Sequence, residues 1–328
     1  MIRERGKCVR FELAAWVIVG ACGALGSCAS EAEPAPVPPT QEMVRQQVVT
    51  ELARKLTSDY VFEDVGALMA EAVLAKLDSG AYDVPSSSQE LASLLTDDLR
   101  SISNDKHLGV ILSGPAVTNP GARPTSPIAR VDILDGNIGY IESMGMPPID
   151  VSRAAIADAF ADVHDTDALI LDNRRNGGGD PRTVAFFISY LSEGPSYVVN
   201  RFHWREGNRV EEFQTTELGE LSYGQEKPVF VLTSGATFSA GEELAYDIQA
   251  QGRGLIIGEV TGGGAHPSRG VPLGHAFIAV IPFGRAVNPV TGTNWEGTGV
   301  QPDVEVPADQ ALMEAQRLAA EPFMMALP

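Results

Sequence analysis

The spacing of apolar residues changes along the chain, and the change divides it into two regions. Between residues 41 and 112, apolar side chains recur every three or four positions on three segments, which is the spacing of amphipathic helices. The apolar faces that this spacing predicts are Val44, Val48, Leu52 and Leu56; Leu68, Ala72, Ala75 and Leu77; and Leu91, Leu94, Leu95 and Leu99. The pattern therefore predicts a small helical N-terminal domain over residues 41–112.

Beyond residue 128, short apolar runs alternate with helical patterns, which is typical of βαβ units. Strands are predicted over 129–134, 138–143, 168–171, 197–205, 210–215, 229–232, 255–257 and 276–282, with a short strand near residue 304. Helices are predicted over 152–163, 181–191 and 309–319, and from residue 239 onward. A Gly-, Pro-, Ser- and Thr-rich linker loop, 113–127, separates the two regions. We therefore expect an α/β fold, with a larger domain over residues 128–328.

The first 27 residues have the pattern of a targeting segment. A basic stretch precedes the apolar stretch 13–25, and Leu25-Gly26-Ser27-Cys28 then resembles a bacterial lipobox. Val19-Gly20-Ala21-Cys22 is a second, weaker match, and an ordinary secretory signal is the alternative. The lipobox predicts that residues 1–27 are a lipoprotein signal peptide and that Cys28 is lipidated.

Residues 28–40 are rich in Pro and Glu, which predicts an extended, solvated tether. We expect such a chain in the bacterial cell envelope, held by its lipid and facing the periplasm or the exterior. The lipid anchor is then its only expected contact with the membrane.

Composition excludes several classes of function. The net charge is −19 and no basic stripe is present, which argues against binding to nucleic acid. All three cysteines, Cys8, Cys22 and Cys28, lie in the leader or at its end. The folded body is therefore expected to have no disulfide, no thiol nucleophile and no Cys-ligated zinc. We expect neither a cofactor nor a metal.

The stretch 229–264 contains the strongest candidate nucleophile. The apolar run 229–232 predicts a buried strand, a Thr-Ser-Gly turn follows it, and a helical pattern begins at Ser239. A hydroxyl in the first turn of a helix lies beside free backbone N–H groups, which can stabilise an oxyanion. The alternative is that Ser239 only caps the helix, with Glu242 completing the capping box Ser-Ala-Gly-Glu.

A second connection from strand to helix contains the loop Asn176-Gly177-Gly178-Gly179. Unblocked N–H groups in such a loop can face an anion. The loop matches neither the P-loop pattern nor the dinucleotide-binding pattern, which argues against a phosphate-binding enzyme. A simple tight turn before the helix is the alternative.

A serine nucleophile needs a base, and the last lysine, Lys227, precedes Ser239. The remaining candidates are His107, His164, His203, His266 and His275. His107 stands beside Asp105, where a polar turn changes to an apolar strand, whereas His266 and His275 flank a loop after the second group of glycines. The residues alone indicate Ser239 with one of these histidines.

Three motifs together resemble the tail-specific, or C-terminal processing, serine protease family. They are LILDNRRNGGGD at 169–180, TSGATFSAGEE…GRGLIIGEVTGGG within 233–264, and EGTGVQPDVEV at 296–306. The resemblance covers most of residues 41–306 and implies a crotonase/ClpP-like catalytic domain with Ser239 as nucleophile. Two features depart from many members: Gly264 stands where they have a lysine, and the linker 113–127 is too short for their PDZ domain.

In both of these features the chain resembles another branch, which contains the interphotoreceptor retinoid-binding protein repeat and the tricorn protease core. This resemblance implies that His107 is the base and that Glu296 supports it. Lys106 stands where the tricorn core has a serine that joins its histidine to its glutamate. Asp105 is therefore a second candidate for orienting His107.

The same resemblance implies that the N–H groups of Gly178 and Ala240 donate to the oxyanion. Gly177, within the first motif, and His266, two residues after the second, are further candidates for support.

We therefore expect a serine endopeptidase that acts on peptides, unfolded proteins or protein C-terminal tails in the cell envelope. The alternative is a non-catalytic module that binds hydrophobic ligands, as the retinoid-binding relatives do. The presence of Ser239, His107, Glu296 and both glycine loops favours the enzyme, because a decayed site need not keep them. The sequence does not indicate an oligomeric state.

Overall fold

The computed structural model of the protein describes residues 40–114 and 125–321. The predicted signal peptide 1–27, Cys28 and all of the tether except Thr40 lie outside the described residues. Within the two described ranges, no helix combines the length and the apolar character needed to cross a membrane.

Three helices form the N-terminal region, as the apolar spacing predicted. They are α1 (Gln41–Asp59), α2 (Glu63–Asp78) and α3 (Ser88–Ser103), with the 3-10 turn η1 (Ala81–Asp83) before α3. The hydroxyls of Thr40 and Ser87 accept backbone N–H groups at the starts of α1 and α3. These caps satisfy donors that the first turn of a helix leaves free.

The buried face of α2 differs from the predicted one. Gly66, Met69 and Val73 are buried, whereas Leu68 is 55% exposed. The cause is a close approach between α1 and α2, because a Cβ on Gly66 would lie 2.5 Å from the carbonyl oxygen of Leu56. Apolar spacing takes no account of glycine, so the predicted face was wrong.

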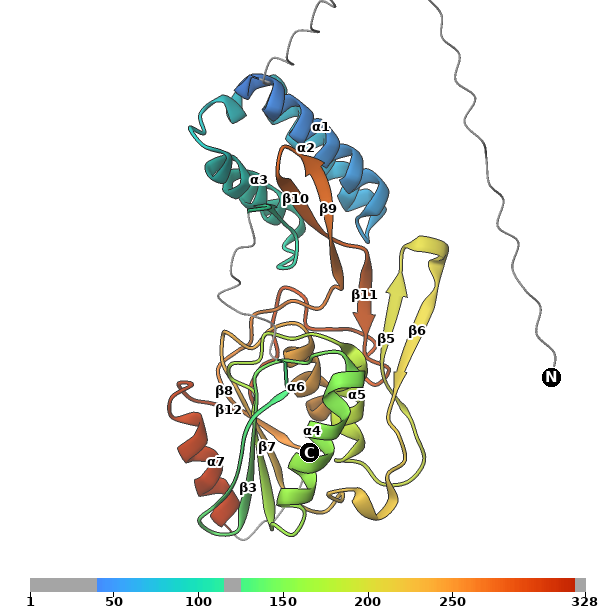
Figure 1. Cartoon of the computed structure of the whole chain (residues 1–328), viewed down its shortest axis with the longest axis vertical. Coiled ribbons are helices and arrows are strands. Elements are labelled where there is room, and N and C mark those ends of the chain that lie inside the picture. Colours follow the sequence, from blue (N-terminus) through green and yellow to red (C-terminus); the bar gives the residue numbers. More distant parts are fainter. Residues whose placement is uncertain (1–39, 115–124, 322–328) are drawn as a thin grey trace, which may run out of the picture. The chain divides into compact units, whose positions relative to one another are not determined.

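Strands from the C-terminal half of the chain complete the core of the helical region. β1 (Gly109–Leu112) pairs antiparallel with β10 (Phe277–Pro282), and β10 pairs with β9 (Ser268–Gly274). Figure 1 shows the β9–β10 hairpin beside α1. Its residues that pack into the helical core are Val271, Leu273, Phe277, Ala279 and Ile281. The sequence predicted β10 but not β9, because Gly270 and Pro272 interrupt the apolar pattern of β9.

The C-terminal region is built around a six-stranded sheet with the order β12-β8-β7-β4-β3-β2. Its strands are β2 (Ile128–Leu134), β3 (Ile138–Ser143), β4 (Ala168–Asp172), β7 (Val229–Thr233), β8 (Leu255–Gly258) and β12 (Val304–Glu305). All neighbours pair parallel except β2 and β3, which form the predicted antiparallel hairpin. Every residue of β4 and β7 is buried, as expected where both faces of a parallel sheet are covered.

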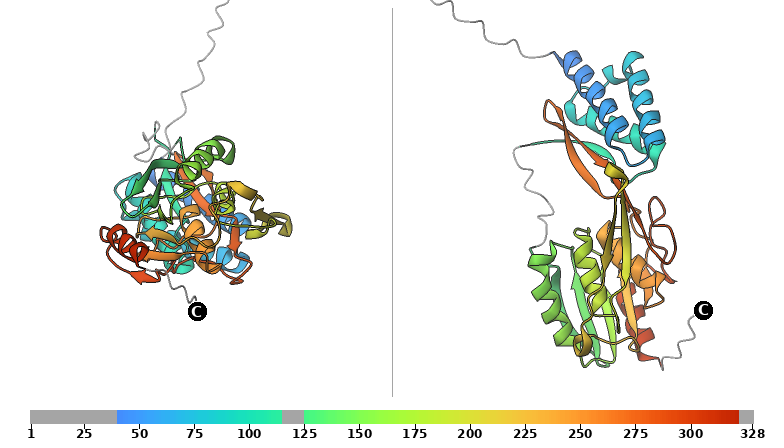
Figure 2. Two further views of the ribbon diagram at one scale, coloured as in Figure 1. Left: turned by 90° about the horizontal axis from the view of Figure 1, so that it is seen from below. Right: turned by 90° about the vertical axis from the view of Figure 1, so that its right-hand side faces the viewer.

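Helices cover both faces of this sheet. α4 (Ile149–Val163), α5 (Pro181–Ser189) and α6 (Ala240–Ala250) pack on one face, and α7 (Ala311–Ala320) packs on the other. Leu169 of β4 lies in the core with α4–α6, whereas its neighbour Ile170 lies in the core with α7. Figure 1 shows this arrangement, and the right view of Figure 2 shows it with α4 in green and α7 in red.

A third sheet has the order β11-β5-β6. β5 (Val198–Trp204) and β6 (Val210–Gln214) form the predicted hairpin, and β11 (Gly284–Val287), which the sequence did not predict, pairs with β5. The connections contain the 3-10 turns η2 (Glu206–Asn208) and η3 (Gly219–Leu221). The predicted α/β class with a helical N-terminal region is confirmed, and the crotonase/ClpP-like assignment stays a prediction.

Candidate active site

Ser239 lies at the turn between β7 and α6, immediately before the first residue of α6. Its backbone has φ 55° and ψ −125°, a sparsely populated conformation that costs a non-glycine residue roughly 1–3 kcal/mol. Its N–H donates to Oε2 of Glu242 at 2.8 Å, which forms one half of the predicted capping box. The strained turn therefore holds the serine beside the free N–H groups at the start of α6.

The glycine loop after β4 lies directly against Ser239. Gly178 has φ 94°, and a Cβ on it would lie 2.6 Å from Cβ of Ser239 and 2.8 Å from the backbone nitrogen of Ala240. Only glycine therefore allows this approach. The two predicted oxyanion donors, Gly178 and Ala240, meet at the candidate nucleophile. A Cβ on Gly177 would meet no atom within 4 Å, so this residue faces open space.

Asn176 joins the two loops, a function that the sequence analysis did not assign to it. Its carbonyl accepts the N–H of Phe238 at 2.9 Å, and its Nδ2 donates to the Ser143 hydroxyl at 2.9 Å. Its Oδ1 accepts the N–H of Gly178 at 2.9 Å. That donor is therefore engaged within its own loop in this conformation.

His107 lies between α3 and β1, and its ring packs on the ring of Phe238, the residue before Ser239. The two ring centroids are 4.6 Å apart. In the described part of the chain, no hydrogen bond joins His107 to Ser239, and Nδ1 of His107 is buried without a hydrogen-bond partner. The structure thus brings the predicted base close to the nucleophile through Phe238.

The packing around Gly264 leaves no room for a lysine side chain. A Cβ at this position would lie 2.4 Å from Cζ of Phe238 and 2.7 Å from Cε1 of His107. The two rings therefore occupy the space that a side chain at residue 264 would need.

Burial sets the protonation state of His107. Removal from water lowers the pKa of its imidazole to about 4, and the charge of Asp105 opposes this shift only in part. His107 is therefore neutral near pH 7 and able to accept a proton, as a general base must be.

The predicted supporting carboxylates contact the backbone around His107 and not its ring. Oδ1 of Asp105 accepts the N–H of His107 at 3.0 Å, and Oε1 of Glu296 accepts the N–H of Lys106 at 3.0 Å. Oδ2 of Asp105 faces Nδ1 of His266 at 2.7 Å. Burial and the nearby charge of Asp105 raise the pKa of Glu296. Both carboxylates therefore fix the segment that contains His107.

Glu242 has a second function besides capping. Its Oε1 accepts the hydroxyl of Thr261 at 2.5 Å and the N–H of Gly263 at 2.6 Å, and its Oε2 accepts the N–H of Gly264 at 2.9 Å. Burial raises the pKa of Glu242, and these donors offset the rise only in part. Glu242 thus connects the Ser239 turn to the loop that contacts His107. Only the capping-box spacing signalled it in the sequence.

The remaining three histidines, His164, His203 and His275, lie outside the candidate active site. His164 caps the end of α4 and pairs with Asp165, His203 lies in β5, and Nε2 of His275 contacts Gln47 of α1. Of the histidines considered as bases, only His107 and His266 lie at the candidate site.

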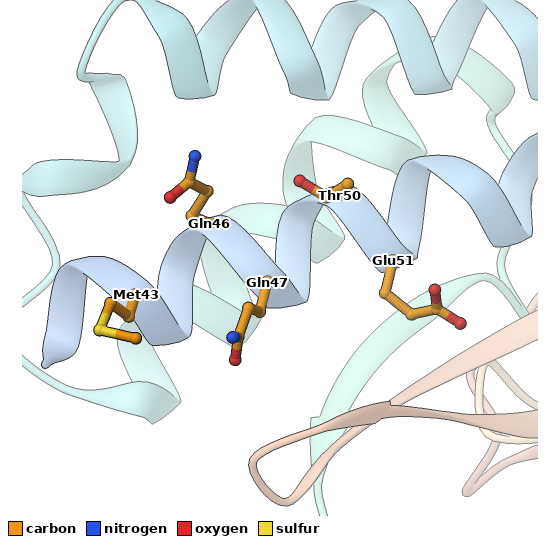
Figure 3. Close-up of a pocket in the computed structure, with 5 residues that line it drawn as sticks. All are labelled: Met43, Gln46, Gln47, Thr50 and Glu51. Atoms are coloured by element: carbon orange, nitrogen blue, oxygen red, sulfur yellow. The ribbon is translucent and has the colours of Figure 1, made fainter. Parts of the chain in front are cut away.

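Two surface hollows lie away from Ser239 and His107. One, of about 430 Å³, lies along α1, and Figure 3 shows the side chains that line it: Met43, Gln46, Gln47, Thr50 and Glu51. The other, of about 250 Å³, is lined by residues of α4, α5 and β6 and of the segment after β6. Neither lining contains Ser239 or His107, so neither is the candidate active site.

Two family models match the chain. The model described as peptidase family S41 matches residues 137–306, and the model described as the N-terminal domain of S41 peptidases in eukaryotic IRBP matches residues 41–134. The first range contains Ser239, Gly178 and Glu296, and the second contains His107. The matched ranges thus include all the residues that form the site.

A curated relative and two solved structures are similar to the chain. A carboxy-terminal-processing protease of Bartonella bacilliformis is 30% identical over 179 residues, which cover 53% of this chain and 39% of the relative. The chain therefore spans about two fifths of that relative's length. The photosystem II D1 C-terminal processing protease has a TM-score of 0.51 at 16% identity, over 83% of this chain and 94% of its own.

The tricorn protease has a TM-score of 0.54 at 15% identity, over 83% of this chain and 36% of its own. At these identities, the two structures indicate a shared fold. The family model, by contrast, covers more than half of the sequence. Together with the strained serine between two glycine loops, this match shows that the chain belongs to peptidase family S41, whose carboxy-terminal processing members are serine hydrolases.

Proposed function

We propose that this protein is a serine endopeptidase with Ser239 as nucleophile, His107 as general base and Glu296 as a supporting carboxylate. The observation that carries the proposal is the meeting of three features: a strained Ser239 at the start of α6, the Gly178 loop pressed against it, and a buried, neutral His107 on Phe238.

The geometry supports acyl transfer. The Oγ of Ser239 attacks the carbonyl carbon of the scissile bond, and His107 takes the hydroxyl proton. Nδ1 of His107 is the buried nitrogen, so Nε2 is the atom assigned to this transfer. His107 then gives the proton to the leaving amine, which leaves an acyl-enzyme on Ser239. In the second half of the reaction, His107 takes a proton from water, the water oxygen attacks the acyl carbon, and His107 returns the proton to Oγ of Ser239.

The N–H groups of Gly178 and Ala240 stabilise the oxyanion of the tetrahedral intermediate. For Gly178 this requires an exchange, because its N–H donates to Oδ1 of Asn176 in the resting structure. When substrate binds, the N–H of Gly178 therefore leaves Oδ1 of Asn176 and donates to the oxyanion instead. Losing one such donor typically costs roughly 10²–10³ in rate.

Peptides, unfolded proteins or protein C-terminal tails are the proposed substrates, in line with the name of the Bartonella relative. The bacterial cell envelope is the proposed location, with a lipid on Cys28 as the anchor. Only the leader sequence supports this location.

Cleavage of unfolded casein tests the proposal, with products identified by mass spectrometry. We expect wild type to release peptides and Ser239→Ala to release none. Equal cleavage by both proteins would assign the activity to a contaminant or to another residue.

The alternative is a module that binds hydrophobic ligands. It is favoured by one observation, the lack of a hydrogen bond between His107 and Ser239 within the described residues. A folded protein that cleaves nothing and copurifies with an extractable apolar ligand would support this alternative.

A further inference from the structure

A buried cluster lies next to the backbone of Lys106 and His107. It consists of Asp105, His266 and Glu296, whose nearest polar atoms all lie within 4.8 Å of one another. Nδ1 of His266 lies 2.7 Å from Oδ2 of Asp105 and 3.5 Å from Oε2 of Glu296. Asp105 is fully buried and His266 is 5% exposed.

The surroundings of this cluster fit a hydrogen bond from His266 to Asp105 better than a metal ion. Oε2 of Glu296 accepts the N–H groups of Ala265 at 2.5 Å and of His266 at 3.1 Å, so backbone donors occupy its lone pairs. Oδ2 of Asp105 also accepts the Tyr60 hydroxyl at 3.1 Å. Since both groups facing Nδ1 of His266 are acceptors, Nδ1 carries the hydrogen.

The cluster connects two segments that are far apart in the chain. On one side, Asp105 and Glu296 hold the backbone N–H groups of His107 and Lys106. On the other side, Glu296 holds the backbone of residues 265–266, and the His266 ring binds Asp105. The His266 side chain thus ties the segment that contains the base to the loop over residues 263–266.

The same loop is tied to the nucleophile. Glu242 accepts the N–H groups of Gly263 and Gly264, and it also accepts the N–H of Ser239. A series of buried and partly buried hydrogen bonds, joined through the backbone of residues 263–266, therefore runs from Ser239 through Glu242 and His266 to His107.

We propose that His266 is a positioning residue, whose Nδ1–H bond to Asp105, beside Glu296, holds His107 in register with Ser239. The inference rests on the proposed function. This arrangement positions His107 through its backbone. Nδ1 of the His107 ring has no partner among the described residues, and Lys106 stands where the tricorn core has a bridging serine.

Two substitutions separate this positioning from simple space filling. His266→Leu removes the donor, whereas His266→Asn places an amide N–H near the position of Nδ1. We expect His266→Leu to lower kcat and the rate of fluorophosphonate labelling by up to about 10²-fold with KM nearly unchanged, since small misplacements of catalytic groups have effects of this size. We expect His266→Asn to keep most of the rate.

The matched controls are His164→Leu and His164→Asn, because His164 is partly exposed and lies outside the site. Hydrogen exchange at the amides of Lys106 and His107 gives a readout that does not require activity. We expect faster exchange in His266→Leu and slow exchange in wild type and in His266→Asn.

The inference would be overturned if folded His266→Leu were labelled at the wild-type rate and its Lys106 and His107 amides exchanged at the wild-type rate. A stoichiometric metal in the purified protein together with loss of labelling on chelation would also overturn it. If wild type is not labelled at all, the proposed peptidase function fails, and the exchange data still decide whether His266 holds the 106–107 segment.

Discussion

At the scale of single residues, Gly264 is what leaves room for His107 beside Phe238. The rings of Phe238 and His107 fill the space that any side chain there would occupy. Many relatives of the tail-specific type have a lysine at this position. A lysine side chain here would collide with the rings of Phe238 and His107, so this packing and a lysine at residue 264 exclude each other. A glycine at 264 is what allows the imidazole to reach Phe238.

Gly264→Ala tests this packing. A methyl group 2.4 Å from Phe238 and 2.7 Å from His107 forces the rings to move. We expect the free energy of unfolding to fall by about 1–3 kcal/mol, with slower labelling of Ser239. Gly235→Ala is the control, because its Cβ would meet nothing within 4 Å; we expect a change within about 1 kcal/mol. Equal effects in urea denaturation would refute the packing argument.

The buried imidazole predicts an unusual pH dependence. Because burial lowers the pKa of His107 to about 4, the base is neutral and active at all pH values well above 4. The rate of fluorophosphonate labelling is therefore expected to rise with pH around 4 and to be level between about pH 5.5 and 7. An acid limb centred near the ordinary histidine value of 6.5 would show that His107 is not the base, or not buried when it acts.

At the scale of elements, α6 follows the proposed nucleophile and contains two buried acids, Glu243 and Asp247. Asn288 donates to Oδ1 of Asp247 at 2.8 Å, whereas Oε1 of Glu243 and Oδ2 of Asp247 have no hydrogen-bond partner among the described residues. Burial raises the pKa of Glu243 to about 8 and that of Asp247 well above its ordinary value. The folded protein therefore retains protons here that the unfolded chain releases.

This difference in proton binding predicts that stability falls with pH. The free energy of unfolding is expected to decrease from about pH 4.5 to about pH 8 and then to level off, because only the folded state holds the proton in that window. Glu243→Gln should flatten the decrease in urea denaturation at pH 5.5, 7 and 9. Glu220→Gln, at an exposed position, should not. Parallel curves for wild type and Glu243→Gln would contradict this.

At the scale of the whole described structure, the site depends on contacts between regions that are distant in the chain. β1, which follows His107, pairs with β10 so that Gly109 lies opposite Val280. Arg205, at the end of β5, donates to the carbonyl oxygens of Tyr60 and Thr57 in the helical region. The position of His107 relative to Ser239 is therefore set by long-range pairing as well as by the local turn.

This dependence explains how much of the site the sequence could predict. The turns at Ser239 and Gly178 follow from local strand, glycine and helix signals, and the structure brings them together. His107 was singled out as the base only by family resemblance. The bond between Asp105 and His266 spans 161 residues, and His266 lies two residues before the unpredicted strand β9. No local pattern indicates such a contact.

The central claim is that Ser239 is activated by His107. Fluorophosphonate labelling of wild type beside Ser239→Ala and His107→Ala, each checked for native folding, tests it most directly. We expect labelling of wild type and none in either variant. Labelling of His107→Ala at the wild-type rate would contradict the assignment of the base, and no labelling of folded wild type would contradict the assignment of an activated serine.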